Sequence, residues 1–163
     1  MLDFLLNLNP LLYAIVISFL PIAELRVGIP VAVASGTPLF WAFFWCTLAN
    51  ILVTPIAFLF LETLHKWLIR IKFYKKIFNK TVARVRKKAQ KPIDKYGAIG
   101  LAIFVAVPLP GTGAWAGSLA AWIFGLDRKK SFLAISLGVI IAGILVALAT
   151  AGALNGISWM LKA

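Results

Sequence analysis

The sequence predicts an all-α integral membrane protein, a single membrane domain over residues 1–163. It is expected to hold two inverted repeats, each a re-entrant helical hairpin followed by a transmembrane helix, joined by a basic amphipathic helix. Hydrophobic residues make up 62% of the chain and charged residues 13%, and the mean hydropathy is +0.96, as is typical of multi-pass membrane proteins. Prolines interrupt two apolar stretches, and most basic residues lie in one segment between the two halves.

The first predicted repeat, residues 1–62, contains two half-length helices and one full span. The apolar run from Pro10 to Pro21 would measure roughly 16 Å as a helix, about half of a bilayer core. Proline disrupts a helix, so Pro21 is expected to end this piece, and the turn at Gly36 to end the next. Asn50, in the full span that follows, is expected to bond across the bundle or to serve helix packing. The expected helices cover residues 10–20, 22–34 and 40–61.

The linker, residues 63–95, holds twelve Lys and Arg against one acid, Asp94. Its apolar residues recur at helical spacing, which predicts an amphipathic helix. Lying in the membrane interface, this helix would place Trp67, Phe73 and Phe78 among the lipids. An alternative is a cytoplasmic linker that is basic only because basic loops stay inside. The cations expected to face anionic head groups are Lys75, Lys76, Lys80, Arg84 and Lys88.

The second predicted repeat, residues 96–163, has the same order of elements as the first. A half-length apolar run is broken by the segment from Pro108 to Gly113, and a second half-length piece ends at Gly125. The charged segment from Asp127 to Lys130 is expected to cap a final long span. The expected helices cover residues 98–107, 114–124 and 132–154.

The distribution of charge favours re-entrant hairpins over straight spans. With straight spans, the basic linker and the loop at residues 128–130 would lie on opposite sides of the membrane, against the tendency of Lys and Arg to stay inside. With hairpins, both lie in the cytoplasm, and the termini and the turn at residues 36–38 lie outside. The two halves are then inverted in the cytoplasmic membrane, which is the plan of many secondary transporters with a site near the midplane.

The candidate site is built from charges and helix breaks in these hairpins. Charges at membrane depth are rare and mark functional sites. Arg26 offers a guanidinium suited to a phosphate or carboxylate, and helix N-termini after the breaks attract anions. Glu24 is expected to respond to protons. The alternatives are a purely structural ion pair and, for Gly113 with Gly117, simple helix packing. The candidate substrate or ion-binding residues are Glu24, Arg26, Pro30, Asn50, Pro108, Pro110, Gly111, Thr112 and Gly113.

Several function classes are not expected from the sequence. Cys46 is the only cysteine and His65 the only histidine, so a disulfide framework or a metal centre is not expected within one chain. No catalytic motif or cofactor motif is found, and an enzyme is not expected. The basic residues are bunched beside membrane segments, so anionic lipids are expected as partners rather than nucleic acid. The spacing of Gly152 and Gly156 fits close packing, either in a homodimer or within one chain.

Two motifs, residues 21–30 and 108–117, carry a resemblance to a known family. With residues 130–132 and Gly138, they resemble the small multi-drug export protein family over nearly the whole chain. That resemblance implies a membrane transporter.

The pattern is also similar, more distantly, to the DedA/VTT superfamily, whose paired re-entrant hairpins are linked to transport of phosphate-bearing lipids such as polyprenyl phosphates. In that comparison Glu24 falls on the acidic residue of the first hairpin. The chain departs from the second-hairpin arginines of DedA proteins, because Val107 and Gly113 stand there and Arg26 supplies the positive charge. The second-hairpin motif falls on Phe104, Pro110 and Ala116-Gly117.

Three functions follow as hypotheses. The first is a flippase or scramblase that moves an anionic lipid, a polyprenyl phosphate or a phospholipid, with or without coupling to protons. The second is a proton-coupled exporter of small amphiphilic drugs, in which Glu24 is the counter-ion of a cation. The third is a membrane scaffold that recruits a partner through the basic helix and transports nothing.

Overall fold

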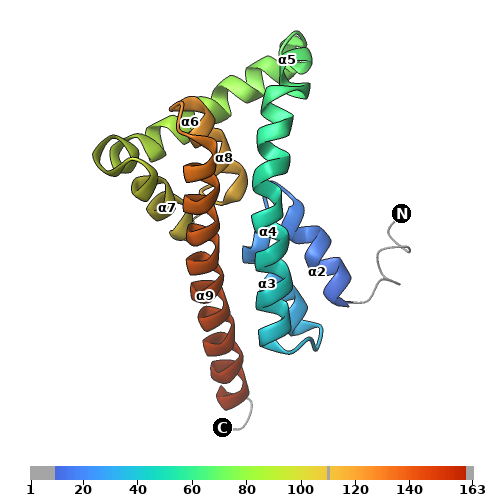
Figure 1. Ribbon diagram of the computed structural model, residues 1–163. Coiled ribbons are helices and arrows are strands. Elements are labelled where there is room, and N and C mark those ends of the chain that lie inside the picture. Colours follow the sequence, from blue (N-terminus) through green and yellow to red (C-terminus); the bar gives the residue numbers. More distant parts are fainter. Residues whose placement is uncertain (1–9, 110, 161–163) are drawn as a thin grey trace. The chain divides into compact units, whose positions relative to one another are not determined.

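The computed structural model describes residues 10–109 and 111–160, without side chains for residues 154–160. Every regular element of this described part is a helix, as the sequence predicts (Figure 1). The chain forms two compact units, which are Met1–Asn50 with Ile141–Ala163, and Ile51–Ile140. The predicted boundaries of the two repeats stay predictions.

Among the described residues, two helices are long and apolar enough to cross a membrane. They are α4 (Leu39–Glu62), of 24 residues, and the part of α9 (Arg128–Met160) that runs from Arg128 to Ala153, of 26 residues. The predicted full-length apolar helices are therefore confirmed. α9 begins four residues earlier than expected, because Asp127 Oδ1 accepts a hydrogen bond of 2.9 Å from the Lys130 N–H and so caps the first turn.

Four further apolar helices are too short to span a bilayer alone. They contain 9 to 11 residues, so each is about 15 Å long, half of the hydrocarbon thickness. The predicted breaks in both apolar stretches are therefore present. Re-entrance and inversion in a membrane stay predictions. The four helices are α2 (Pro10–Phe19), α3 (Glu24–Ala34), α7 (Ala98–Ala106) and α8 (Ala114–Ile123).

In the first unit, α2 and α3 fold back on one another as a helical hairpin (Figure 1). The closest approach is at Gly28 of α3, where an added Cβ would lie 2.1 Å from Ser18 Oγ and 2.9 Å from the Ala14 carbonyl oxygen. Ser18 donates its own hydroxyl proton to that carbonyl, at 2.8 Å. Only glycine fits at this crossing, so the glycine at position 28 allows the two short helices to pack closely as a pair.

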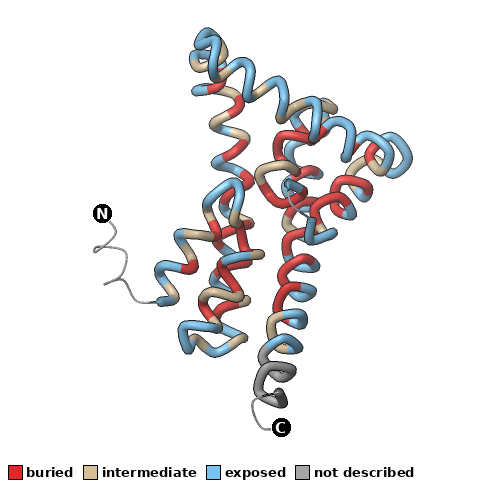
Figure 2. The backbone as a smooth tube through the Cα atoms, turned by 180° about the vertical axis from the view of Figure 1, so that it is seen from behind, coloured by how far each residue is buried: buried red, intermediate tan, exposed pale blue. Residues whose placement is uncertain are grey.

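The second unit is organised by α6 (Lys72–Tyr96), which packs against both α7 and α8. Most of α6 is exposed, and its buried residues, Val85, Ala89 and Ile93, recur at helical spacing (Figure 2). This is the amphipathic pattern that the sequence predicts.

The linker is two helices rather than the single helix expected from the sequence. A short helix, α5 (Leu64–Leu68), ends in a turn, and α6 starts after the extended residue Ile71. The turn brings His65 Nδ1 to 3.0 Å from Tyr74 Oη. In a straight helix these two residues, nine apart, would be separated by about 13 Å along the axis. The break therefore allows the His65 ring to contact the start of α6.

Around His65, aromatic side chains of α6 and α8 form a small cluster. The His65 ring centroid lies 4.0 Å from that of Phe78 and 5.6 Å from that of Trp122. Phe78 is half-buried in this cluster, and its contact with lipid stays a prediction. Trp67 and Phe73 remain 76% and 75% exposed, as an interfacial helix requires.

Acidification is expected to destabilise this cluster. Burial lowers the pKa of His65, so the unfolded chain binds the proton more readily, and stability falls as the pH drops below about 6.5. The melting temperature of the purified protein should therefore decrease between about pH 7.5 and about pH 5.5. His65→Phe keeps an aromatic ring but cannot titrate, so its melting temperature should change less over the same range. An equal decrease in both proteins would contradict this assignment.

Candidate functional site

The first helix break separates α2 from α3 and ends at Glu24. The Glu24 N–H donates to the Leu20 carbonyl at 3.1 Å, which closes the turn that contains Pro21. Glu24 has a φ of +52°, in the left-handed region that residues other than glycine rarely adopt. Such strain costs on the order of 1–3 kcal/mol and is found mainly at functional sites. Glu24 is 4% exposed, so the strained backbone holds a carboxylate inside the protein.

Arg26 lies beside Glu24, on the first turn of α3. Its Nη1 is 3.9 Å from Glu24 Oε2, and the two side chains are 16% and 5% exposed. A charge-assisted hydrogen bond would measure about 2.8 Å, so the two groups attract each other without forming a short bidentate pair. A guanidinium and a carboxylate are thus held close together in apolar surroundings, where electrostatic interactions are stronger than in water.

Pro30 lies inside α3, one turn beyond Arg26. In a regular helix the residue at this position would donate its N–H to the Arg26 carbonyl, and proline has no N–H to donate. The sequence places Pro30 among the site residues as part of the proline-flanked motif. In the structure, Pro30 acts on the backbone next to Arg26, because it cannot make this helical hydrogen bond.

The second helix break separates α7 from α8 and is closed by Thr112. The Thr112 hydroxyl donates to the carbonyl oxygens of Val107 and Leu109, at 2.7 and 2.8 Å, and Gly111 adopts a φ of +76° that favours glycine. The hydroxyl proton is therefore shared between two carbonyl oxygens of the turn, and the N-cap residue of α8, Gly113, makes no side-chain cap bond. Pro108 is exposed, and Pro110 lies outside the described residues.

Gly117 follows this turn on α8 and serves helix packing. A Cβ at Gly117 would lie 2.6 Å from Val105 Cγ2 and 3.3 Å from Ile135 Cγ1. Gly117 therefore serves close helix packing, which was the alternative interpretation of the spacing between Gly113 and Gly117.

Asn50, the remaining predicted site residue, is buried in α4 at 1% exposure. Within the described residues its Oδ1 has no hydrogen-bond partner, and neither has Thr47 Oγ1. These two residues are three apart and so share one face of the helix. Thr47 was not among the predicted site residues, although a second polar residue at that spacing in an apolar span was a usable signal. Gly143 of α9 lies against Thr47, since a Cβ there would be 2.7 Å from Thr47 Oγ1.

The predicted site residues are divided between the two units. Glu24, Arg26, Pro30 and Asn50 belong to the first unit, and the Pro108 to Gly113 turn belongs to the second. The structure brings Glu24 and Arg26 together. The meeting of both breaks in one central site stays a prediction.

The predicted membrane-facing cations all lie on the exposed part of α6. The five residues, Lys75, Lys76, Lys80, Arg84 and Lys88, are exposed. Together with the exposed aromatic residues at the start of the linker, they form a surface that suits anionic head groups. Their contact with lipid stays a prediction. Among the described residues, no group of three or more His, Cys, Asp or Glu could hold a metal ion.

Two long apolar helices, four short apolar ones and a basic amphipathic helix define a small helical membrane protein. A family model described as "Putative small multi-drug export protein" matches residues 24–145, a stretch that begins with α3, directly after the first helix break, and contains the linker and the second break. The chain belongs to this family, as its motifs predict. No curated protein and no solved structure matches the chain.

Proposed function

We propose that this protein is a transporter that moves an anionic lipid across the bilayer, as a flippase or scramblase, through a midplane site between two re-entrant hairpins. A polyprenyl phosphate or a phospholipid is the proposed substrate class. The observation that carries the proposal is the buried Glu24 and Arg26 pair at a strained helix break, because charges are kept inside apolar segments mainly for binding.

The pair suggests how binding and release would alternate. While Glu24 is ionised, its charge balances that of Arg26 and the site has no net charge. When Glu24 takes up a proton, Arg26 is left with an unbalanced positive charge and attracts a phosphate. Loss of the proton restores the competing carboxylate and favours release. Proton movement and lipid movement are then coupled, because the Glu24 carboxylate and the lipid phosphate compete for the Arg26 guanidinium.

Reconstitution into liposomes tests this function directly. A fluorescent phosphatidylglycerol in the inner leaflet should become accessible to an external quencher at a rate at least about tenfold above that of empty liposomes. A fluorescent phosphatidylcholine and a cationic dye should not move faster than in empty liposomes. Equal movement of both lipids would mean that the charge of the head group is not recognised, and movement of the dye alone would favour the second function below.

A second candidate function is export of small amphiphilic drugs, which the description of the family favours. In that function Glu24 would be the counter-ion of a cationic substrate, and Arg26 would repel it. The same liposomes distinguish the two candidates, because a cationic drug and an anionic lipid require opposite charges at the site.

The proposed topology places the linker in the cytoplasm, both termini outside, and the two turns that precede α4 and α9 on opposite faces of the membrane. In a Cys46→Ala background, Ser35→Cys should react with an impermeant thiol reagent added outside intact cells. Lys130→Cys should react only after the membrane is opened. Both native residues are exposed, so a failure to react reflects location. Reaction of both cysteines from outside would indicate straight spans instead.

A further inference from the structure

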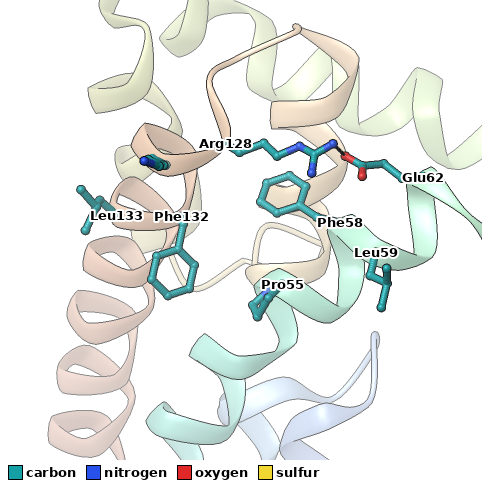
Figure 3. Close-up of a pocket in the computed structure, with 8 residues that line it drawn as sticks. Pro55, Phe58, Leu59, Glu62, Arg128, Phe132 and Leu133 are labelled. Carbon is teal, nitrogen blue, oxygen red and sulfur yellow. Dashed lines mark ion pairs between the residues drawn. The ribbon is translucent and has the colours of Figure 1, made fainter.

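A groove lies in the second unit, between the end of α4 and the start of α9, outside the candidate site. Figure 3 shows its apolar walls and the ion pair at one end. Its volume is about 490 Å³, within the usual range for sites that bind small molecules. The apolar lining residues are Pro55, Phe58, Leu59, Phe132 and Leu133.

Charged side chains occupy one end of the groove. Arg128 Nη2 pairs with Glu62 Oε1, and Lys129 also lines the groove. Two cations face one carboxylate, so the net charge at this end is positive. Arg128 is 67% exposed while Glu62 is 30% exposed, and a guanidinium has five N–H donors. The exposed part of Arg128 therefore retains donors that Glu62 does not use.

The order of polar and apolar residues follows the depth of a membrane. Glu62 is the last residue of one apolar span, and Arg128 is the first residue of the other. Pro55 lies seven residues before Glu62, about 10 Å deeper along α4, and Phe132 lies one turn beyond Arg128. The charges therefore lie where each span would meet water, and the apolar walls lie at the depth of acyl chains.

The geometry points to a binding site for one anionic phospholipid in this groove, with the phosphate on Arg128 and Lys129 and an acyl chain against Phe58 and Leu59. Charge decides the occupant. An anionic lipid complements the net positive end, a zwitterionic lipid brings no net charge, and a cationic amphiphile meets two like charges. The groove's lining residues include none of the candidate site residues, and the proposal does not depend on transport.

Native mass spectrometry of the detergent-purified full chain tests the site by counting bound lipids. Phosphatidylglycerol and phosphatidylcholine with identical acyl chains are added at equal concentrations. The wild type should bind about fivefold more phosphatidylglycerol than phosphatidylcholine, a difference that corresponds to about 1 kcal/mol. Free glycerol phosphate should not displace the lipid, because it has no acyl chain to fill the groove. Displacement by glycerol phosphate would show a simple phosphate site and overturn the proposal.

Matched variants separate this site from general attraction to a basic protein. Arg128→Ala/Lys129→Ala should lower phosphatidylglycerol binding about fivefold, whereas Lys87→Ala/Lys91→Ala removes the same charge from exposed positions of α6 and should leave binding unchanged. Equal losses in both variants would overturn the proposal. Stronger binding of a cationic amphiphile by the groove variant, with no loss of lipid, would assign the groove to a cation.

Two further variants keep the test decisive. Lys129→Ala alone leaves the Glu62 and Arg128 pair intact, so it carries the test if the double variant does not fold. Leu59→Gln places an amide against the acyl chain and should lower binding, while Leu52→Gln alters a similarly exposed leucine of α4 that does not line the groove. Unchanged binding by Leu59→Gln would show that the apolar groove is not used. All these measurements detect binding, so their outcome does not depend on whether the protein moves lipid across the bilayer.

Discussion

Replacing Arg26 with alanine is expected to lower transport of phosphatidylglycerol in liposomes about tenfold or more, close to the rate of empty liposomes. The substitution removes the guanidinium that would bind the phosphate, and it removes the positive charge that lies beside the buried Glu24 carboxylate. Both effects oppose entry of an anion. The measurement is the initial rate of lipid movement at equal amounts of reconstituted protein.

Two variants control for this result. Arg86→Ala removes one positive charge from an exposed position of α6 and should transport normally. Arg26→Lys keeps the charge without the planar fork and should retain part of the activity. Normal transport by Arg26→Ala would overturn the proposed anion site. If Arg26→Ala functions normally in cells while charge reversals on α6 do not, the protein is a scaffold that acts through its basic helix.

The largest expected loss of stability is that of Gly100→Ala. A Cβ at Gly100 of α7 would lie 1.9 Å from the Pro92 carbonyl oxygen and 2.3 Å from its carbonyl carbon. These atoms belong to the backbone of α6 and cannot rotate away, so the two helices must separate. The expected cost is about 3 kcal/mol, measured as a decrease in melting temperature on the order of 10 °C in detergent.

Gly152→Ala is the matched control for this substitution. Gly152 of α9 has no atom within 4 Å of an added Cβ, so alanine there should be neutral or should stabilise the helix by up to about 1 kcal/mol. A similar loss of stability in both variants would contradict the close contact between α6 and α7.

Sequence periodicity and prolines predicted most of the helices because these features act locally. The apolar spans, the break before Glu24 and the break after Val107 all follow from residues close in the chain. The break at residues 69–71 could not be predicted in this way. At this break His65 contacts Trp122, 57 residues further along the chain, and no local pattern in the linker predicts that contact.

The sequence identified the charged residues of the candidate site, but not how they are held. The left-handed backbone conformation of Glu24 depends on the geometry of the first turn. The sharing of the Thr112 hydroxyl between two carbonyl oxygens depends on the geometry of the second. The groove between α4 and α9 was not predicted for another reason. Glu62 and Arg128 lie 66 residues apart in the sequence, so only the folded chain shows that they form a pair.

The close crossing at Gly28 has a consequence for biosynthesis. Neither α2 nor α3 alone is long enough to act as a stop-transfer segment. We therefore expect the two helices to enter the bilayer as a packed pair. A bulky side chain at residue 28 would hinder this step, because it would keep α3 away from Ser18.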